Sequence, residues 1–270
     1  MNLRLSPPRI PFIFPSSPFF LHTIHPRMTS THQATLIPSD SAPGHRIHID
    51  LHVHSNHSVD SVIPLRALVR CWERHRILPV VCDHDTLSGS LALIRALRGV
   101  RAGVPEIPAM EITTAEGEII GLFLTDGIPP NLPAAETLDR IRDQGALSLV
   151  PHPFCTYRSR VLRPPVRDAL AHRIDVIEGY NGRNHWDADN LAALEYARER
   201  DIPVSAGSDA HTPMELGRTY MALEPFTTPS EFLRALRSAR IHFRRMHRGI
   251  HMVTRAVKMV RGRGRKRPIH

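Results

Sequence analysis

The sequence predicts an α/β fold in which most strands run parallel. The chain has 270 residues, of which 41% are hydrophobic and 23% charged, so it is able to bury a substantial core in one domain or in two small ones. From His45 onward, apolar runs of strand length alternate with stretches of helical periodicity, which is the pattern of a parallel sheet with crossover helices. Both observations exclude a chain that is disordered throughout.

Eight apolar runs are predicted to be strands, because each has strand length and is bounded by polar or turn-forming residues. In order, they cover Arg46–Val53, Leu78–Cys82, Ile107–Ile112, Glu118–Leu124, Ala146–Val150, Asp175–Glu178, Val204–Ala206 and Thr219–Leu223.

Helices are predicted between these strands. Apolar side chains recur with helical spacing from Leu65 to Trp72, directly after Pro64, a favourable first-turn residue. A last helix begins at Thr228, which has capping-box spacing to Glu231. The other predicted helices are Ser90–Arg98, Ala134–Gln144, Pro165–Ala171 and Asp187–Arg200.

Both ends of the chain are expected to lie outside the folded domain of residues 46–240. Residues 1–45 contain eight prolines, so we expect a disordered leader or translated sequence upstream of a true start at Met28, with an export or transit segment as the alternative. Residues 240–270 hold 11 Lys and Arg and no acidic residue, which leaves 24 basic and 26 acidic residues in 1–239. The tail of residues 241–270 therefore accounts for the basic charge, either as a solubilising end or as a contact for nucleic-acid phosphates.

Two residue types exclude whole classes of protein. The only lysines are Lys258 and Lys266, both in the tail, so the domain has no lysine for a P-loop, a pyridoxal enzyme or a Schiff-base aldolase. The three cysteines form no CxxC pair, which argues against a disulfide framework and a structural zinc finger. We therefore expect a reducing, cytoplasmic location, and the interrupted apolar patch near the start is too short to span a membrane.

Metal-ligand residue types follow the predicted strands. His52 and His54 alternate with apolar residues, so both point to one face of the first strand. One histidine after a strand is more often a hydrogen-bonded loop residue than a ligand, but ligand types at six strand ends favour a metal centre, because the carboxyl ends of strands in a barrel converge. The remaining members are His57, Asp60, Asp83, His84, Asp85, Glu111, His152, Asp209 and His211.

Six runs resemble, in order, the motifs of the PHP (polymerase and histidinol phosphatase) superfamily. They are DLHVHSNHSVDS (50–61), VCDHDTLSG (81–89), MEITTAEGEIIGLFL (110–124), VPHPF (150–154), IEGYNGR (177–183) and AGSDAHTPMELG (206–217). The resemblance covers roughly residues 46–240, and the motifs are specific when taken together. It implies a distorted (β/α)7 TIM-like barrel that binds two or three divalent ions (Zn, Mn or Fe) at the C-terminal ends of its strands and hydrolyses phosphoesters.

The resemblance also implies a role for individual residues. His52, His54, Glu111 and Asp209 are expected to bind a first ion, and Glu111 to bridge to a second ion that His152 also binds. Asp60, His84 and His211 are expected to bind a third. Glu118 replaces a histidine found in many members; it is expected to face the second ion, with a solvent-facing position at the strand start as the alternative.

Phosphoester hydrolysis requires a nucleophile and positive charge on the phosphoryl oxygens, and a metal-activated water with paired ions supplies both. Arg158, Arg160 and Arg163 are candidates to bind phosphate, the alternative being a solvated loop. Asp85 is expected to protonate the leaving oxygen or to support His84. The rim is expected to include Glu178, Asn181 and Arg183, whereas Cys155 is expected to pack.

The favoured function is a metal-dependent phosphoric ester hydrolase acting on a small phosphomonoester. Only 33 residues separate Glu118 from His152, so we expect an open pocket without a helical insert. A nuclease or polymerase-associated exonuclease is the alternative, because the basic tail could contact nucleic acid. An amidohydrolase-like barrel is less favoured, since many of these use a carboxylated lysine, and a barrel retained only as a binding module is least favoured.

Overall fold

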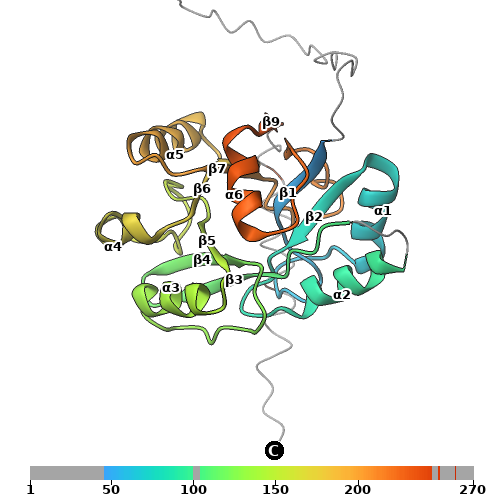
Figure 1. Ribbon diagram of the computed structural model, residues 1–270, viewed down its shortest axis with the longest axis horizontal. Helices are drawn as coiled ribbons and strands as arrows, with labels where there is room; N and C mark the ends of the chain where they lie inside the picture. Colours follow the sequence, from blue (N-terminus) through green and yellow to red (C-terminus); the bar gives the residue numbers. More distant parts are fainter. Residues whose placement is uncertain (1–45, 100–103, 245–248, 250–258, 260–270) are drawn as a thin grey trace, which may run out of the picture. The chain divides into compact units, whose positions relative to one another are not determined.

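The computed structural model describes residues 46–99, 104–244, 249 and 259 (Figure 1). The expected leader, residues 1–45, and most of the expected basic tail lie outside the described residues. Among the residues described, no helix has the length and apolar character needed to cross a membrane.

The strands of the described chain form two mixed sheets, so the α/β class is confirmed. The first sheet has the order β2-β1-β8-β9 and the second the order β3-β4-β5-β6-β7. The bounds are β1 Ile47–Val53, β2 Ile77–Val81, β3 Ala109–Thr114, β4 Gly117–Leu122, β5 Leu147–Val150, β6 Val176–Asn181, β7 Val204–Gly207, β8 Tyr220–Leu223 and β9 Arg240–His242. The short strand β9 was not predicted; it pairs with β8 and extends the sheet to His242, just beyond the expected domain boundary.

The expectation of a largely parallel sheet is wrong for β4 and for β8, which run antiparallel to both of their neighbours. Only Ala115 and Glu116 connect β3 to β4, and a parallel pair needs a crossover of about a dozen residues or more. Gly117 closes the turn with φ +143°, and a Cβ there would lie 2.4 Å from Leu162 Cα. As a result, β4 begins at the edge where β3 and β5 end, and this places Glu118 at that edge.

Two single parallel bridges link the sheets at the carboxyl ends of their strands. One joins Val53 at the end of β1 to Ala210, and the other joins His84, after β2, to Glu111 of β3. The pairing within the described residues is thus two mixed sheets joined at two points, not one continuous hydrogen-bonded barrel.

Helices flank the sheets (Figure 1). Helices α1 and α2 contact β2, α3 contacts β4 and β5, α5 contacts β6 and α6 contacts β7. The final helix begins as predicted, because Thr228 Oγ1 accepts a hydrogen bond from Glu231 N at 3.2 Å. The bounds are α1 Leu65–His75, α2 Ser88–Arg98, α3 Ala134–Asp143, α4 Pro164–Leu170, a 3₁₀ turn Ala171–Arg173, α5 Asp187–Glu199 and α6 Pro229–Arg237.

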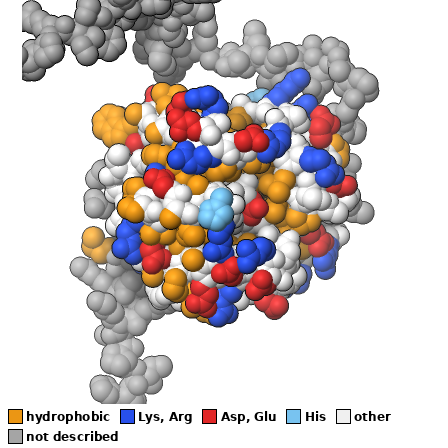
Figure 2. Space-filling model, turned by 60° about the vertical axis from the view of Figure 1, so that its left-hand side comes forward, with side chains coloured by type: hydrophobic (Ala, Val, Ile, Leu, Met, Phe, Trp, Pro, Cys, Tyr) orange, Lys and Arg blue, Asp and Glu red, His pale blue; other side chains and the backbone are white. Residues whose placement is uncertain are grey.

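Strand β1 shows how the fold creates a polar interior. Its apolar residues Ile49, Leu51 and Val53 are completely buried, and so are the alternating His52 and the adjacent His54. The outer surface is different: Figure 2 shows basic and acidic side chains interspersed over one face of the described residues, as the near-balanced charge of residues 1–239 predicts. The polar side chains that stand out, such as His52 and His54, are therefore in the interior and not on the surface.

Candidate metal centre

Four fully buried side chains from four strands or strand ends meet in what we call the inner cluster. The cluster consists of His52 of β1, Glu111 of β3, and His152 and Asp209, which follow β5 and β7. His52 Nε2 lies 3.6 Å from Glu111 Oε2 and 3.7 Å from Asp209 Oδ1, and His152 Nε2 lies 3.2 Å from Glu111 Oε1. Their side chains are 0 to 1% exposed, so water has no direct access to them.

A second group, the outer cluster, lies beside the first and consists of Asp60, His84, Glu118 and His211. Asp60 Oδ2 lies 3.3 Å from His84 Nε2 and 3.6 Å from His211 Nε2. His84 Nδ1 lies 3.7 Å from Glu118 Oε1. The His84 side chain is 21% exposed, which opens this cluster to solvent.

Glu111 and His54 connect the two clusters. The Oε2 atom of Glu111 lies 3.3 Å from both His54 Nε2 and His84 Nδ1, while its Oε1 faces His152. The ring of His54 lies 4.3 Å from that of His211 and 5.1 Å from that of His52, measured between centroids. One carboxylate thus faces both clusters, which is the geometry required of a bridging ligand.

The donor atoms are close enough for several of them to contact one ion. Within each of four groups, the nitrogen and oxygen atoms all lie within 4.8 Å of one another. These groups are His54–Asp60–His84–His211, His52–Glu111–His152, His52–His54–Asp209 and His84–Glu111–Glu118. Imidazole and carboxylate donors in such a set suit Zn, Mn or Fe.

The charges of the clusters also fit divalent cations. Burial disfavours ionisation of Asp209 and Glu111, but Arg158 beside Asp209 and the rings of His84 and His52 beside Glu111 hold the pKa of both carboxyls well below the usual range. Burial also disfavours a charged His54, but the carboxylates of Asp209 and Glu111, at 3.5 and 3.3 Å from its Nε2, raise its pKa to about 10. Without metal, protons and a guanidinium neutralise the buried carboxylates, and a cation can replace them.

One buried oxygen supports the same conclusion. Asp209 Oδ1 has no hydrogen-bond partner, although it faces His52 and His54. A buried carboxylate oxygen without a hydrogen-bond partner is costly, and a metal ion would satisfy it. The residues present therefore fit a metal centre.

Glu118 faces the clusters, so the solvent-facing alternative is wrong. It is 4% exposed, and its carboxylate lies 3.7 Å from His84 Nδ1 and 3.8 Å from His152 Nε2. Burial and the charge of Glu111 raise its pKa to about 7. The reversed direction of β4 explains how a residue at a strand start reaches this edge.

The three candidate arginines lie in three different environments. Arg158 turns inward and pairs with Asp209 Oδ2. Arg160 is 56% exposed, donates to Thr113 Oγ1 at 2.9 Å and lies 3.8 Å from Glu118. Arg163 points away, donating to the carbonyl of Ala115 at 3.0 Å, in agreement with the solvated-loop alternative for this residue.

Asp85 does not contact His84 through its carboxylate. Its oxygens accept hydrogen bonds from Thr113 N at 2.7 Å and Thr113 Oγ1 at 3.0 Å, so it fastens its loop to the end of β3. Its neighbour Asp83, which the sequence placed among the metal-ligand residue types, lies outside the four donor groups. Its carboxylate instead accepts hydrogen bonds from the backbone N–H and the hydroxyl of Ser55.

The expected rim residues are instead buried. Glu178, Asn181 and Arg183 are 2%, 0% and 4% exposed. Arg183 NH1 lies 2.7 Å from His211 Nδ1, and its Nε lies 3.2 Å from Glu215 Oε1. Glu215, which sequence reasoning missed, accepts from the backbone N–H of His211 at 2.9 Å. A pattern of residue types cannot distinguish such internal supports from a solvent-facing rim.

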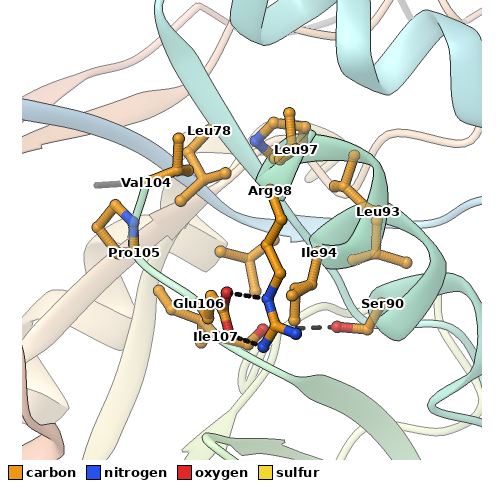
Figure 3. A pocket seen from close by; sticks show the side chains of 13 residues that line it. Leu78, Ser90, Leu93, Ile94, Leu97, Arg98, Val104, Pro105, Glu106 and Ile107 are labelled. Carbon is orange, nitrogen blue, oxygen red and sulfur yellow. Dashed lines mark hydrogen bonds and ion pairs between the residues drawn. The ribbon is translucent and has the colours of Figure 1, made fainter. Parts of the chain in front are cut away.

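A polar cavity of about 480 Å³ opens beside the outer cluster. It is lined by His57, Val59, His84, Asp85, Thr86, Ser88, Glu118 and Arg160. A separate cavity of about 270 Å³ lies between β2 and α2 and is mostly apolar, with an Arg98–Glu106 ion pair in its lining (Figure 3). The predicted site residues all lie outside the lining of this second cavity, and only the polar one adjoins the candidate ligands.

Comparison with known proteins identifies similar chains. The PHP-associated family matches residues 187–241. An uncharacterized protein of Methanocaldococcus jannaschii, MJ0417, is 38% identical over 200 residues, which cover 70% of this chain and 78% of that protein.

Solved structures share the fold. A two-domain protein from Bacteroides vulgatus, containing a predicted PHP-like metal-dependent phosphoesterase, superposes with a TM-score of 0.59 at 20% identity over 73% of this chain. The chain spans only 65% of the length of that structure. The lesion-specific endonuclease PfuEndoQ from Pyrococcus furiosus superposes with a TM-score of 0.53 at 18% identity, over 73% of this chain and 57% of the other.

Proposed function

This chain belongs to the PHP superfamily, and from that premise we propose that it is a metal-dependent phosphoesterase that hydrolyses a small phosphomonoester. The observation that carries the proposal is the position of Glu111, whose two oxygens face different histidines in two adjoining clusters. A carboxylate in that position suits two or more cations at short separation, which is an arrangement used for phosphoryl chemistry.

The distorted (β/α)7 barrel is part of this proposal. The Val53–Ala210 and His84–Glu111 bridges lie at the two seams between the sheets, where a barrel would close. Each bridge contains a candidate ligand or a residue next to one. The same residues would therefore close the barrel and form the site.

We assign the ligands by cluster. His52, His54, Glu111, His152 and Asp209 would bind ions at the inner cluster; Asp60, His84, Glu118 and His211, with His54 and Glu111 shared, would complete the outer one. Bound divalent ions supply Lewis acidity, lowering the pKa of water to about 7 and neutralising phosphoryl oxygens.

The chain's own residues would orient the substrate. Arg160 lines the polar cavity, and more than half of its side chain is exposed. It would therefore be able to exchange its bond to Thr113 for one to a phosphoryl group. Arg158 offsets the charge of Asp209 and lies at the inner cluster, where it can contact phosphoryl oxygen. Asp85 shapes the same cavity while bound to Thr113, which favours a supporting role over proton donation.

The cavity favours a small substrate. Its volume of about 480 Å³ is within the range of small-ligand sites, roughly 300 to 1,000 Å³. Its hydroxyl and imidazole lining, from Thr86, Ser88 and His57, suits a polar alcohol as the leaving group.

A nuclease is the second candidate, and one observation favours it. Residues 240–270 carry 11 basic side chains and no acid, a composition suited to phosphate backbones. The fold similarity to PfuEndoQ is compatible with this reading. An amidohydrolase-like reaction is less favoured, because the domain has no lysine to bridge two metals.

The test uses the full-length protein. Elemental analysis after purification measures bound metal, and hydrolysis is then compared on p-nitrophenyl phosphate, bis-p-nitrophenyl phosphate and an oligonucleotide, each with added Mn²⁺ or Zn²⁺. We expect at least two ions per chain and a preference for the monoester. A preference for the diester or oligonucleotide would establish the nuclease, and the absence of metal with no activity on restoring it would contradict both.

A further inference from the structure

Glu178 of β6 lies directly behind the inner cluster. Its Oε1 lies 3.0 Å from His52 Nδ1, and its Oε2 accepts hydrogen bonds from the backbone N–H of His152 at 2.7 Å and from Asn181 Nδ2 at 2.9 Å. The Glu178 side chain is 1% exposed, so its carboxylate is hydrogen-bonded by these three groups and not by solvent. One side chain therefore contacts two members of the inner cluster and a neighbour.

The contact between Glu178 and His52 determines which nitrogen of the His52 ring is able to bind a metal. An ionised carboxylate only accepts hydrogen bonds, so His52 Nδ1 must carry the proton that it shares with Glu178. The other nitrogen, Nε2, then faces Glu111 and Asp209 and is able to bind a metal.

Asn181 extends this support to a third strand. Its amide nitrogen donates to Glu178 Oε2 at 2.9 Å and to Asp209 Oδ2 at 3.1 Å. Through two residues of β6, the ligands His52, His152 and Asp209 are therefore tied together although they come from three separate strands.

A backbone irregularity makes this arrangement possible. Residues three apart in a regular strand point to opposite faces, yet Glu178 and Asn181 both face the inner cluster. The register between β6 and β7 shifts between Glu178 and Tyr180, which corrects the alternation by one residue. Gly207 packs directly against His52 and Glu178. A Cβ at this position would lie 2.4 Å from His52 Cβ and 2.8 Å from Glu178 Oε1, so a larger residue would displace them.

We propose that Glu178 and Asn181 are positioning residues that fix the ligating nitrogen of His52 and the mutual placement of His52, His152 and Asp209. They would set the metal affinity of the inner cluster and leave the outer cluster unaffected. Within the part of the chain that the structure describes, neither side chain has a hydrogen bond to Asp60, His84 or His211. The inference rests on the proposed metal centre but assigns a role that the ligand set does not contain.

The test titrates metal-free, full-length protein with Mn²⁺ or Co²⁺ alone, by calorimetry and by the visible absorption of bound Co²⁺. Glu178→Gln keeps the side-chain shape but replaces one carboxylate oxygen by an NH₂ group. That group cannot accept a hydrogen bond, so the contact with either His52 Nδ1 or His152 N–H is lost. We expect it to weaken one metal site about 10- to 100-fold and to change the Co²⁺ spectrum, without altering the other site. Asn181→Ala removes the amide bonds to Glu178 and Asp209 and the one accepted from Arg183 N. It leaves the contacts of Glu178 with His52 and His152 in place, so it should give a smaller loss at the same site.

Asp189→Asn is the matched control, since Asp189 is also a buried carboxylate, 4% exposed, but lies in α5. It should bind metal as the wild type does. Unchanged affinity and spectrum in both Glu178→Gln and Asn181→Ala would overturn the inference, as would equal weakening of both sites or the same loss in Asp189→Asn. If the wild type itself binds no metal, the proposed function fails; a wild type that binds two ions with unaffected variants removes only the positioning role.

Discussion

The inner and outer clusters use the same residue types but are built differently. Inner ligands are 0 to 1% exposed and are supported from behind by Glu178 and Asn181, whereas His84 of the outer cluster is 21% exposed and adjoins the polar cavity. From this difference we expect the inner cluster to retain metal more firmly, and the outer cluster to exchange metal and admit substrate.

The largest effect should come from Glu111, which belongs to both clusters. Glu111→Gln removes the negative charge that the two clusters share, so we expect both metal sites to weaken and turnover of p-nitrophenyl phosphate to fall about 10³-fold or more. Metal content and steady-state kinetics measure this. Loss of only one ion would contradict the bridging geometry.

A matched pair of histidines sharpens the comparison. His152→Ala removes a fully buried inner ligand, and we expect a loss of about 10²- to 10³-fold that added metal does not restore. His84→Ala removes the exposed outer ligand, and we expect a loss of about tenfold that millimolar Mn²⁺ largely restores. Equal losses with equal rescue would mean that the two clusters do not differ in retention.

The pH dependence of stability should separate the metal-free from the metal-loaded protein. His54 has a pKa of about 10 in the folded chain against an ordinary value of 6.5, so its protonation contributes stability that is complete below pH 6.5 and lost as the pH rises toward 10. After EDTA treatment, the melting temperature should therefore fall over this range. With Mn²⁺ bound the fall should be smaller or absent, because metal requires neutral histidine. Thermal melts at several pH values test this, and parallel curves would contradict it.

Glu118 should have a more selective effect. Glu118→Ala is expected to weaken one metal site, and Glu118→His to keep activity while shifting preference from Mn toward Zn, since oxygen ligands favour harder ions. Metal titration of both variants is the measurement. Unchanged stoichiometry and preference in each would remove Glu118 from the site, despite its position 3.7 Å from His84.

The smallest effect is expected at the end of the chain. Removing residues 246–270 should leave hydrolysis of a small phosphomonoester intact, because both clusters precede Gly217. Fluorescence anisotropy at low salt measures oligonucleotide binding in parallel, and the truncated protein should bind more weakly than the full-length chain. A folded truncation that has lost all turnover would show that the tail contributes to the site.

The sequence predicted most of the elements and singled out side chains that the structure brings together, because both depend on local patterns. His52 and His54 share a face as strand alternation requires, and Thr228 caps α6 as its spacing to Glu231 requires. The strand directions were not predictable in the same way, since apolar runs do not encode orientation; only the two-residue link before Gly117 signalled the reversal of β4. The inward turn of Arg158 and the burial of Glu178 depend on tertiary contacts with Asp209 and His52, which no local pattern contains.

The reversed strand β4 also makes part of the site local in sequence. Glu111 and Glu118 belong to one hairpin, in which Glu111 pairs with Ile120 and Thr113 with Glu118, so their contact is local in sequence. His152 lies 41 residues from Glu111 and reaches it only after β5 has docked. The two carboxylates are thus placed by a single hairpin, whereas their contact with His152 also requires β5 to be in position.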